Sequence, residues 1–290
     1  MSYRAEWQNN LSTTEHAAGD RRQSPSIWAD CPQAEMLIDP GVGILFFDDF
    51  LSSYDLATNQ TTVTKLGPYE AYTGNGTNLL VSGGVTGIGG TLVIASGDTA
   101  DINAVFTLGG GAPFMISTTD GDDCDLWFEC RFKISSITTA DQAQVFIGLT
   151  EEDRAAANGI WADAGGDLGF TTTIDLLGFA RSDNDGASVS LAYQKASQTP
   201  QDNNQAAIVA DTFLKLGFKY KPKGDASKRI RTFKNAVEQT TYVTSTNLAA
   251  ATFPNGEELT LCLAVQNDST TTNSVTLDWW KCAQLSEVST

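Results

Sequence analysis

The segment CDLWFECRFKI, residues 124–134, alternates between apolar and mostly charged side chains. Successive side chains of a β-strand point to opposite faces of a sheet. The pattern therefore predicts a strand with one face in a hydrophobic core and one face in water. The face expected in water carries five side chains: Asp125, Trp127, Glu129, Arg131 and Lys133.

Short β-rich runs of this kind recur along the chain from residue 44, and turn residues such as Gly, Asn, Asp and Pro separate them. We predict strands at 44–50, 69–72, 79–81, 91–95, 102–107, 114–117, 125–134, 144–149, 168–173, 176–181, 188–194, 212–221, 230–234, 240–244, 258–266 and 274–284. Only the segment EEDRAAA, residues 151–157, favours a helix. Many short strands without intervening helices predict an all-β fold, an antiparallel sandwich or barrel.

Length and charge narrow the function. The 290 residues, 41% of them hydrophobic, suffice for one large β domain or two small ones. The formal net charge of -17 gives a surface that repels phosphate and anionic lipid. We therefore expect neither nucleic acid nor a membrane as a partner.

Targeting and cysteine patterns point to synthesis in a reducing cytoplasm. The N-terminal sequence MSYRAEWQNNLSTTEH lacks the apolar region of a signal peptide, and no apolar run approaches the ~20 residues that span a bilayer. The five cysteines form no CxxC pair, and the chain has one histidine. These features disfavour a zinc site and predict buried free thiols.

Two Asp-rich segments, residues 120–125 and 183–186, are the candidates for a calcium site. Neither has the spacing of a calcium loop, because Cys124 and Arg181 occupy positions where a ligand is needed. Both are interpreted as turns, and we expect no metal and no cofactor.

Residues 1–43 differ in texture from the rest, with aromatic side chains scattered without period among polar ones and several Pro and Gly in the second half. Such a segment cannot bury enough surface to fold alone. It is either an extended arm that lies along its own domain or a neighbour, or a disordered leader. We predict an N-terminal arm over residues 1–43 and one β-sandwich domain over residues 44–290.

Catalytic chemistry finds little support in the sequence. Asp125 and Glu129 share one face but lie about 13 Å apart along a strand, whereas glycosidase carboxyl pairs need roughly 5–9.5 Å. His16 lies in the predicted arm, so no Ser-His-Asp or Cys-His site can form inside the domain. The glycine-rich runs lack the lysine or the helix of a phosphate-binding loop. We therefore expect no catalytic residues and no enzyme.

The closing segment SVTLDWWKCAQL, residues 274–285, places tryptophan on both faces of a strand. A period of two puts Trp279 with Leu277 on one face and Trp280 with Asp278 on the other. We expect this strand to be central or covered on both sides. Core packing is the default for such tryptophans, and a sugar-stacking platform is the functional alternative.

Several segments in order resemble a known family: FFDDF, WFECRFKI, VFIGLTEED, DLLGFARSDNDG, TFLKLGFKYKP and VTLDWWKCAQL. Together they resemble the concanavalin-A-like jelly-roll domains of tailed-bacteriophage structural proteins over residues 44–286. The resemblance implies two antiparallel sheets packed face to face. It also implies a virion protein, either a capsid decoration (cement) protein or part of a fibre.

On this resemblance we expect a non-enzymatic decoration protein on the capsid surface, with the major capsid protein and copies of itself, as a homotrimer, for partners. The arm would supply the capsid contacts: Tyr3, Arg4, Trp7, Arg21, Arg22, Ile27, Trp28 and Met36. The alternative is a glycan- or receptor-binding module of a fibre or a lectin, in which Trp127 or Trp161 would stack on sugar. The same fold includes glycosidases with an ExDxE or ExDxxE motif, which this sequence lacks.

Overall fold

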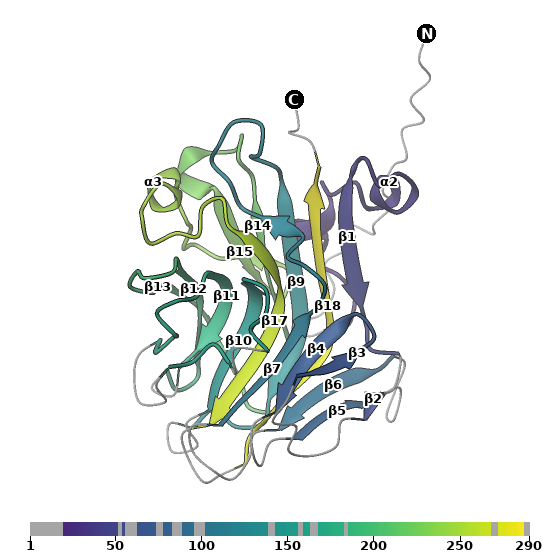
Figure 1. Cartoon of the computed structure of the whole chain (residues 1–290). Coiled ribbons are helices and arrows are strands. Elements are labelled where there is room, and N and C mark those ends of the chain that lie inside the picture. Colours follow the sequence, from purple (N-terminus) through teal and green to yellow (C-terminus); the bar gives the residue numbers. More distant parts are fainter. Residues whose placement is uncertain are drawn as a thin grey trace.

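The chain folds into two antiparallel sheets packed face to face, as the sequence predicts (Figure 1). The computed structural model describes residues 20–51, 54–55, 63–73, 78–82, 89–95, 102–138, 143–155, 159–162, 168–182, 185–267 and 272–286. Within these residues the helices are short, and β-strands form both layers.

Sheet A has the strand order β16-β15-β14-β9-β18-β6-β5-β2, and β1 also pairs with β18. Its strands are β1 Gly43–Asp48, β2 Tyr54–Asp55, β5 Asn78–Ser82, β6 Thr91–Ala95, β9 Leu126–Ile134, β14 Leu214–Tyr220, β15 Ile230–Lys234, β16 Val237–Glu238 and β18 Ser274–Leu285. The first half of β18 pairs with β6 and the second half with β1, while β9 runs along the other edge of β18.

Sheet B has the order β13-β12-β11-β10-β17-β7-β4-β3, and β8 pairs with β17. Its strands are β3 Thr64–Leu66, β4 Tyr69–Thr73, β7 Ile102–Leu108, β8 Phe114–Met115, β10 Ala143–Thr150, β11 Leu176–Arg181, β12 Ser188–Gln194, β13 Gln201–Ala207 and β17 Glu258–Asn267. Gly178 of β11 leaves room for the ring of Phe146, since a Cβ atom at Gly178 would lie 2.8 Å from its Cζ atom.

The main hydrophobic core lies between the sheets, where alternate side chains from strands of both sheets meet. The apolar face predicted for the segment 124–134 points into this core, and Phe128 of β9 stacks on Phe218 of β14 with ring centroids 5.1 Å apart. A second aromatic group surrounds Trp280, whose ring lies 5.9 Å from that of Phe106. All five cysteines are buried, as expected.

The described part of the N-terminal segment, residues 20–42, includes two short helices and is not extended throughout. These two helices are α1 Pro25–Trp28 and α2 Gln33–Ile38. Elsewhere the described residues include the helix α3 Ser245–Leu248 and a 3-10 turn at Ala226–Lys228. Pro25 occupies the first turn of α1, where its missing N–H group costs no helical hydrogen bond. In Figure 1, α2 lies beside one end of β1.

Three sequence predictions of secondary structure were wrong. The helix expected at 151–157 is replaced by turns over 152–155, because Asp153 adopts a left-handed backbone with φ 61°; residues 156 and 157 lie outside the described residues. Segments 168–173 and 240–244 contribute single bridges at Phe170 and Val243 instead of strands. Conversely, β13 was not predicted, because its sequence QDNNQAA lacks apolar alternation.

A bulge changes the faces of β18. Its pairing register with β9 shifts between Leu277 and Trp279, so one extra residue is inserted there. As a result Leu277 and Trp280 share the core, whereas the simple alternation placed Leu277 with Trp279. Trp279 turns instead toward the outer side of sheet A. The expectation that both sides of this strand are covered is confirmed.

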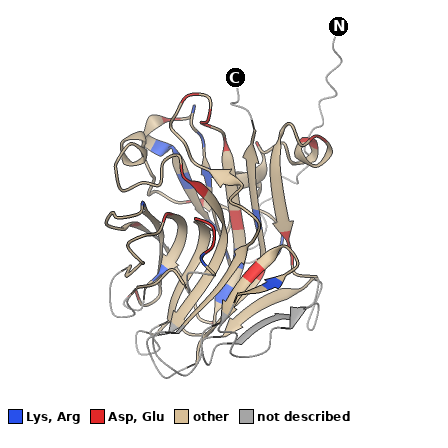
Figure 2. Cartoon of the chain, in the orientation of Figure 1, with Lys and Arg blue, Asp and Glu red and all other residues tan. Residues whose placement is uncertain are grey.

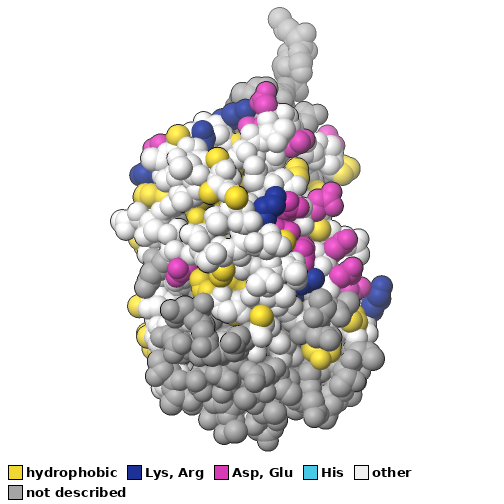
Figure 3. All heavy atoms as spheres, turned by 60° about the vertical axis from the view of Figure 1, so that its left-hand side comes forward, with side chains coloured by type: hydrophobic (Ala, Val, Ile, Leu, Met, Phe, Trp, Pro, Cys, Tyr) yellow, Lys and Arg dark blue, Asp and Glu magenta, His cyan; other side chains and the backbone are white. Residues whose placement is uncertain are grey.

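Charged residues of both signs are interspersed over the described strands and loops (Figure 2). On the face in Figure 3, acidic side chains gather along one side next to a few basic ones, and hydrophobic atoms are scattered. Within the described segments, no helix has both the length and the apolar character that a membrane span requires.

Candidate functional site

The outer face of sheet A is covered by the chain's own N-terminal segment. Trp127 and Glu129 of β9, expected in water, have no exposed surface. The prediction of a solvated face was wrong because Ile27 and Trp28 of α1 pack over it, in one cluster with Trp127. Strand alternation identifies two faces but does not tell which kind of cover lies above the polar one.

Glu129 is the polar centre of this contact. One of its oxygens, Oε2, accepts hydrogen bonds from the backbone N–H of Ser24 at 3.0 Å and from the indole Nε1 of Trp28 at 2.7 Å. Burial raises the pKa of the Glu129 carboxyl, and the hydrogen bonds from Ser24 and the charge of Lys215 oppose the rise. The Lys215 ammonium in turn donates to the backbone oxygen of Arg22 at 2.7 Å. The segment 22–28 is therefore fixed to β9 and β14.

A second polar contact lies at Asp30. Its carboxylate accepts from Trp127 Nε1 at 2.9 Å and pairs with the ammonium groups of Lys219 at 3.3 Å and Lys221 at 3.1 Å. Burial alone would raise the pKa of Asp30, but the hydrogen bond from Trp127 and the two lysine charges together lower it. Lys221 also binds Asp125 at 2.5 Å. Asp30 therefore joins the N-terminal segment to the strands that it covers.

The predicted capsid-contact residues divide into three groups. Ile27, Trp28 and Met36 are buried in contact with sheet A, so in this conformation they are not available to a partner. Arg21 forms an ion pair with Asp278 at 3.0 Å, and Arg22 is exposed and paired with Asp20 at 3.1 Å. The remaining three, Tyr3, Arg4 and Trp7, lie outside the described residues.

Both predicted glycan-stacking residues are buried. Trp127 lies under Asp30, and Lys221 covers its ring at 4.4 Å from the centroid. Trp161 is 4% exposed and stacks on Phe170 at 4.6 Å, in a cluster that covers the outer face of sheet B. Neither ring offers a face to a sugar in this structure, so the stacking role predicted for them has to be corrected.

The two carboxylates of the opening segment are held by different partners. Asp125 is held by Lys221, and Glu129 is held by α1. In the adjacent Asp-rich segment, the ammonium of Lys223 contacts Asp120 at 3.2 Å and Asp123 at 2.8 Å. In the second Asp-rich segment, Asp185 accepts from the backbone N–H of Ser182 at 2.7 Å, whereas residues 183 and 184 lie outside the described residues.

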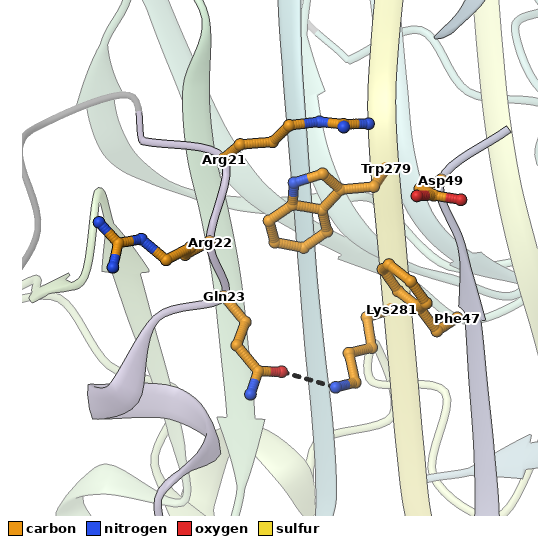
Figure 4. Close-up of a pocket in the computed structure, with 7 residues that line it drawn as sticks. All are labelled: Arg21, Arg22, Gln23, Phe47, Asp49, Trp279 and Lys281. Carbon is orange, nitrogen blue, oxygen red and sulfur yellow. Dashed lines mark hydrogen bonds between the residues drawn. The ribbon is translucent and has the colours of Figure 1, made fainter. Parts of the chain in front are cut away.

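A pocket of about 410 Å³ opens where the N-terminal segment meets β1 and β18. Seven residues line it: Arg21, Arg22, Gln23, Phe47, Asp49, Trp279 and Lys281. Figure 4 shows Arg21 and Gln23 on the N-terminal segment, Phe47 and Asp49 at the end of β1, and Trp279 between Arg21 and Lys281. Phe47 is 54% exposed, which is unusual for a phenylalanine in a sheet.

Lys281 gives this pocket a buried cation. Its ammonium donates to Gln23 Oε1 at 2.6 Å and to Gln33 Oε1, and it lies 4.6 Å from the centroid of the Trp28 ring. Burial lowers its pKa to about 8, against the raising influence of Cys31 and Glu129. The pocket thus combines cationic nitrogens, an exposed ring and one carboxylate.

Sequence reasoning missed the pocket residues of β1 and β18. The bulge that turns Trp279 outward leaves no period-two signal, and Phe47 lies in the run GILFF, whose residues are apolar on both faces. A usable signal was the apolar run itself, which is followed by aspartates at 48 and 49. Apolar residues on both faces of a strand require a cover on both sides of the sheet.

Comparison of the chain with known proteins identifies its fold. No protein-family model and no curated protein sequence matches it. Among solved structures, an endo-1,3-beta-glucanase from Streptomyces sioyaensis is 14% identical, with a TM-score of 0.53, and the match covers 86% of this chain and 98% of the glucanase.

Two further structures are similar at lower TM-scores. Peanut lectin is 12% identical at a TM-score of 0.48, covering 86% of this chain and 99% of the lectin. A carbohydrate esterase of the Shiga toxin-encoding bacteriophage phi24B is 14% identical at a TM-score of 0.42, covering 81% and 99%. Together with the two antiparallel sheets, the glucanase match establishes that the chain has the concanavalin-A-like jelly-roll fold.

Proposed function

We propose that this protein is a non-enzymatic structural protein of a bacteriophage virion, and that it decorates the capsid surface. The observation that carries the proposal is the cover on both sheets. Residues 20–38 lie over sheet A, and the cluster around Trp161 lies over sheet B. A sandwich whose faces are covered by its own chain keeps its edges, ends and N-terminal segment for partners.

The absence of catalysis is part of this proposal. The carboxylates of β9 and β18 are held in ion pairs or hydrogen bonds: Glu129 by Trp28, Asp278 by Arg21 at 3.0 Å and by Arg131 at 2.6 Å. A general acid and a nucleophile must both reach the scissile bond of a substrate, one at the leaving oxygen and the other at the carbon, which these buried and paired groups on a covered face do not favour.

The attachment to the major capsid protein is assigned to residues 1–19, with Tyr3, Arg4 and Trp7 as contacts. This assignment is narrower than the predicted arm of residues 1–43, because Ile27, Trp28 and Met36 are buried against the domain. The fixed segment from Ser24 to Asp30 gives the residues before it a defined starting point on the domain. Arg22, whose side chain is 65% exposed, lies at that base.

Homotypic contacts are assigned to the surface around α2 and the start of β1. Leu37 and Ile38 are 75% and 72% exposed, and Ile44 is 43% exposed. Large apolar side chains gathered in one segment favour a protein interface more than scattered ones do. Copies of this chain around a capsid threefold axis would bury these residues.

Co-sedimentation with capsids stripped of the protein tests this function. Two variants are compared with the full chain: one that begins at residue 20, and Tyr3→Ala with Trp7→Ala. We expect stoichiometric binding of the full chain and loss of binding in both variants, with unchanged circular dichroism. Full binding by the variant that begins at residue 20 would refute the role of the first 19 residues, and absence of binding by the full chain would refute decoration.

The second candidate function, glycan or receptor binding in a fibre or a lectin, is favoured by one specific observation. The pocket between Gln23 and β18 presents the exposed ring of Phe47 beside polar side chains, a combination that suits a sugar. This candidate no longer depends on Trp127 or Trp161, both of which are buried.

A further inference from the structure

We propose that the pocket at the junction of Gln23, β1 and β18 binds a sugar residue that carries a carboxylate, of the uronic acid type. This inference rests on the second candidate function, glycan binding, and adds the ligand class and the binding residues. It is independent of capsid attachment, which the first 19 residues are proposed to mediate.

The first step is the positive charge of the pocket in an acidic protein. The cation that is left for a ligand is Lys281, because Arg21, which also lines the pocket, is paired with Asp278, in a chain with a net charge of -17. Among the described residues, the Lys281 ammonium donates to neutral side-chain amides, and no carboxylate lies within ion-pair distance of it. A buried ammonium without a carboxylate is costly, so a ligand carboxylate that approached it would offset part of that cost.

The second step is the pair of aromatic rings. Phe47 and Trp279 lie 6.5 Å apart between centroids at an interplanar angle of 55°, and Phe47 is 54% exposed. The apolar C–H face of a sugar ring packs on such an exposed ring. Trp279 is 3% exposed, and its indole Nε1 has no hydrogen-bond partner among the described residues. A buried donor without an acceptor costs stability, which a ligand oxygen or a bridging water would restore.

The third step separates a sugar from a simple anion. Asp49 lines the same pocket from the end of β1, where its backbone oxygen accepts from Gly90 N–H at 2.9 Å. A carboxylate accepts hydrogen bonds from hydroxyl groups but repels an anion. Figure 4 places Asp49 beside Phe47, and Gln23 with Lys281 lower in the view. A ligand with hydroxyls at one end and a carboxylate at the other matches this arrangement.

The test is calorimetric titration of the full chain with a short oligogalacturonate, beside a neutral glucose oligomer of the same length and sodium acetate. Short ligands are required, because a long polyanion is repelled by the acidic surface. Phe47→Ala and Arg22→Ala change exposed side chains of the pocket, and Val237→Ala, at a side chain 62% exposed elsewhere, is the matched control.

We expect the oligogalacturonate to bind, the neutral oligomer and acetate to bind at least about tenfold more weakly, and Phe47→Ala to weaken binding about fivefold. Val237→Ala should bind as the wild type does. Equal binding of the neutral oligomer would overturn the acidic class while keeping glycan binding, and equal binding of acetate would overturn the sugar. Binding of neither oligomer, or binding that Phe47→Ala leaves unchanged, would overturn the site itself.

Discussion

The packing of α1 on sheet A makes Trp28 the position at which a substitution best tests the cover on this sheet. Its side chain is fully buried, donates to Glu129 at 2.7 Å and lies beneath the Lys281 ammonium. Replacing a buried tryptophan with alanine costs about 3–5 kcal/mol of unfolding free energy. Loss of the indole donor, which leaves Glu129 Oε2 with only the N–H of Ser24, adds about 1–3 kcal/mol. We expect Trp28→Ala to destabilise the protein by at least about 4 kcal/mol, a large share of the 5–15 kcal/mol typical of a domain.

Trp28→Phe separates the two contributions. Phenylalanine keeps most of the buried ring and loses the indole N–H, so we expect a cost of about 1.5–3 kcal/mol from the lost bond to a charged acceptor. Urea unfolding followed by far-ultraviolet circular dichroism gives the free energies without relying on the fluorescence of the altered residue. Val237→Ala, at an exposed position of β16, should stay within about 0.5 kcal/mol of the wild type.

The result that would refute this reasoning is specific. If Trp28→Ala lowered the unfolding free energy by less than about 1 kcal/mol, the side chain would not be packed on sheet A. Because α1 packs on sheet A, we also expect a chain that begins at residue 20 to be as stable as the full chain, and one that begins at residue 43 to be strongly destabilised. Removal of residues 1–42 would therefore confound any capsid-binding assay with unfolding.

Three further predictions concern the buried ionisable groups. Burial raises the pKa of Glu129, so the folded protein holds the carboxyl proton more tightly than the unfolded one. The free energy of unfolding should therefore fall as pH rises from the ordinary glutamate pKa through the raised one. Unfolding experiments at several pH values should show a smaller decline for Glu129→Gln than for wild type. The pKa of Lys281 is lowered to about 8, so its contribution to stability should rise between about pH 8 and the ordinary lysine value of 10.5, and a Lys281→Met variant lacking this rise would support the assignment. Burial raises the pKa of the Cys31 thiol to about 12 and also raises those of Cys130, Cys262 and Cys282, so a thiol reagent should label none of these four in the native protein and all of them in urea; rapid native labelling would contradict their burial.

Much of the fold follows from the sequence because period two is a strong constraint where one face is apolar. The segments 91–95, 176–181, 188–194 and 230–234 were predicted with the bounds that the structure has. Strands without that signal were missed: the first five residues of β13 are polar, and β2 and β16 have two residues each. Their pairing depends on neighbours in space, which local sequence does not encode.

The candidate site was harder to predict, for two physical reasons. A bulge in β18 exchanges the faces of the two adjacent tryptophans, and nothing in SVTLDWWKCAQL marks where the extra residue falls. The cover on Trp127 and Glu129 comes from a distant part of the chain, since Trp28 precedes Glu129 by 101 positions. A charged strand face looks the same in sequence whether water or Trp28 satisfies it.

The cover on sheet A and the cover on sheet B fit the faces beneath them in different ways. On sheet B, Gly178 leaves space for the ring of Phe146, and the small Ala180 and Ala192 lie in one cluster with Phe146 and Phe170. On sheet A the outward side chains include the charged Glu129 and Lys215, for which the N-terminal segment supplies hydrogen-bond partners. Each face is therefore matched to its own cover, one by shape and the other by charge. Removing either cover would leave a hollow or a buried charge without its partner. The pocket of Phe47 and Lys281 lies at the margin of the cover on sheet A.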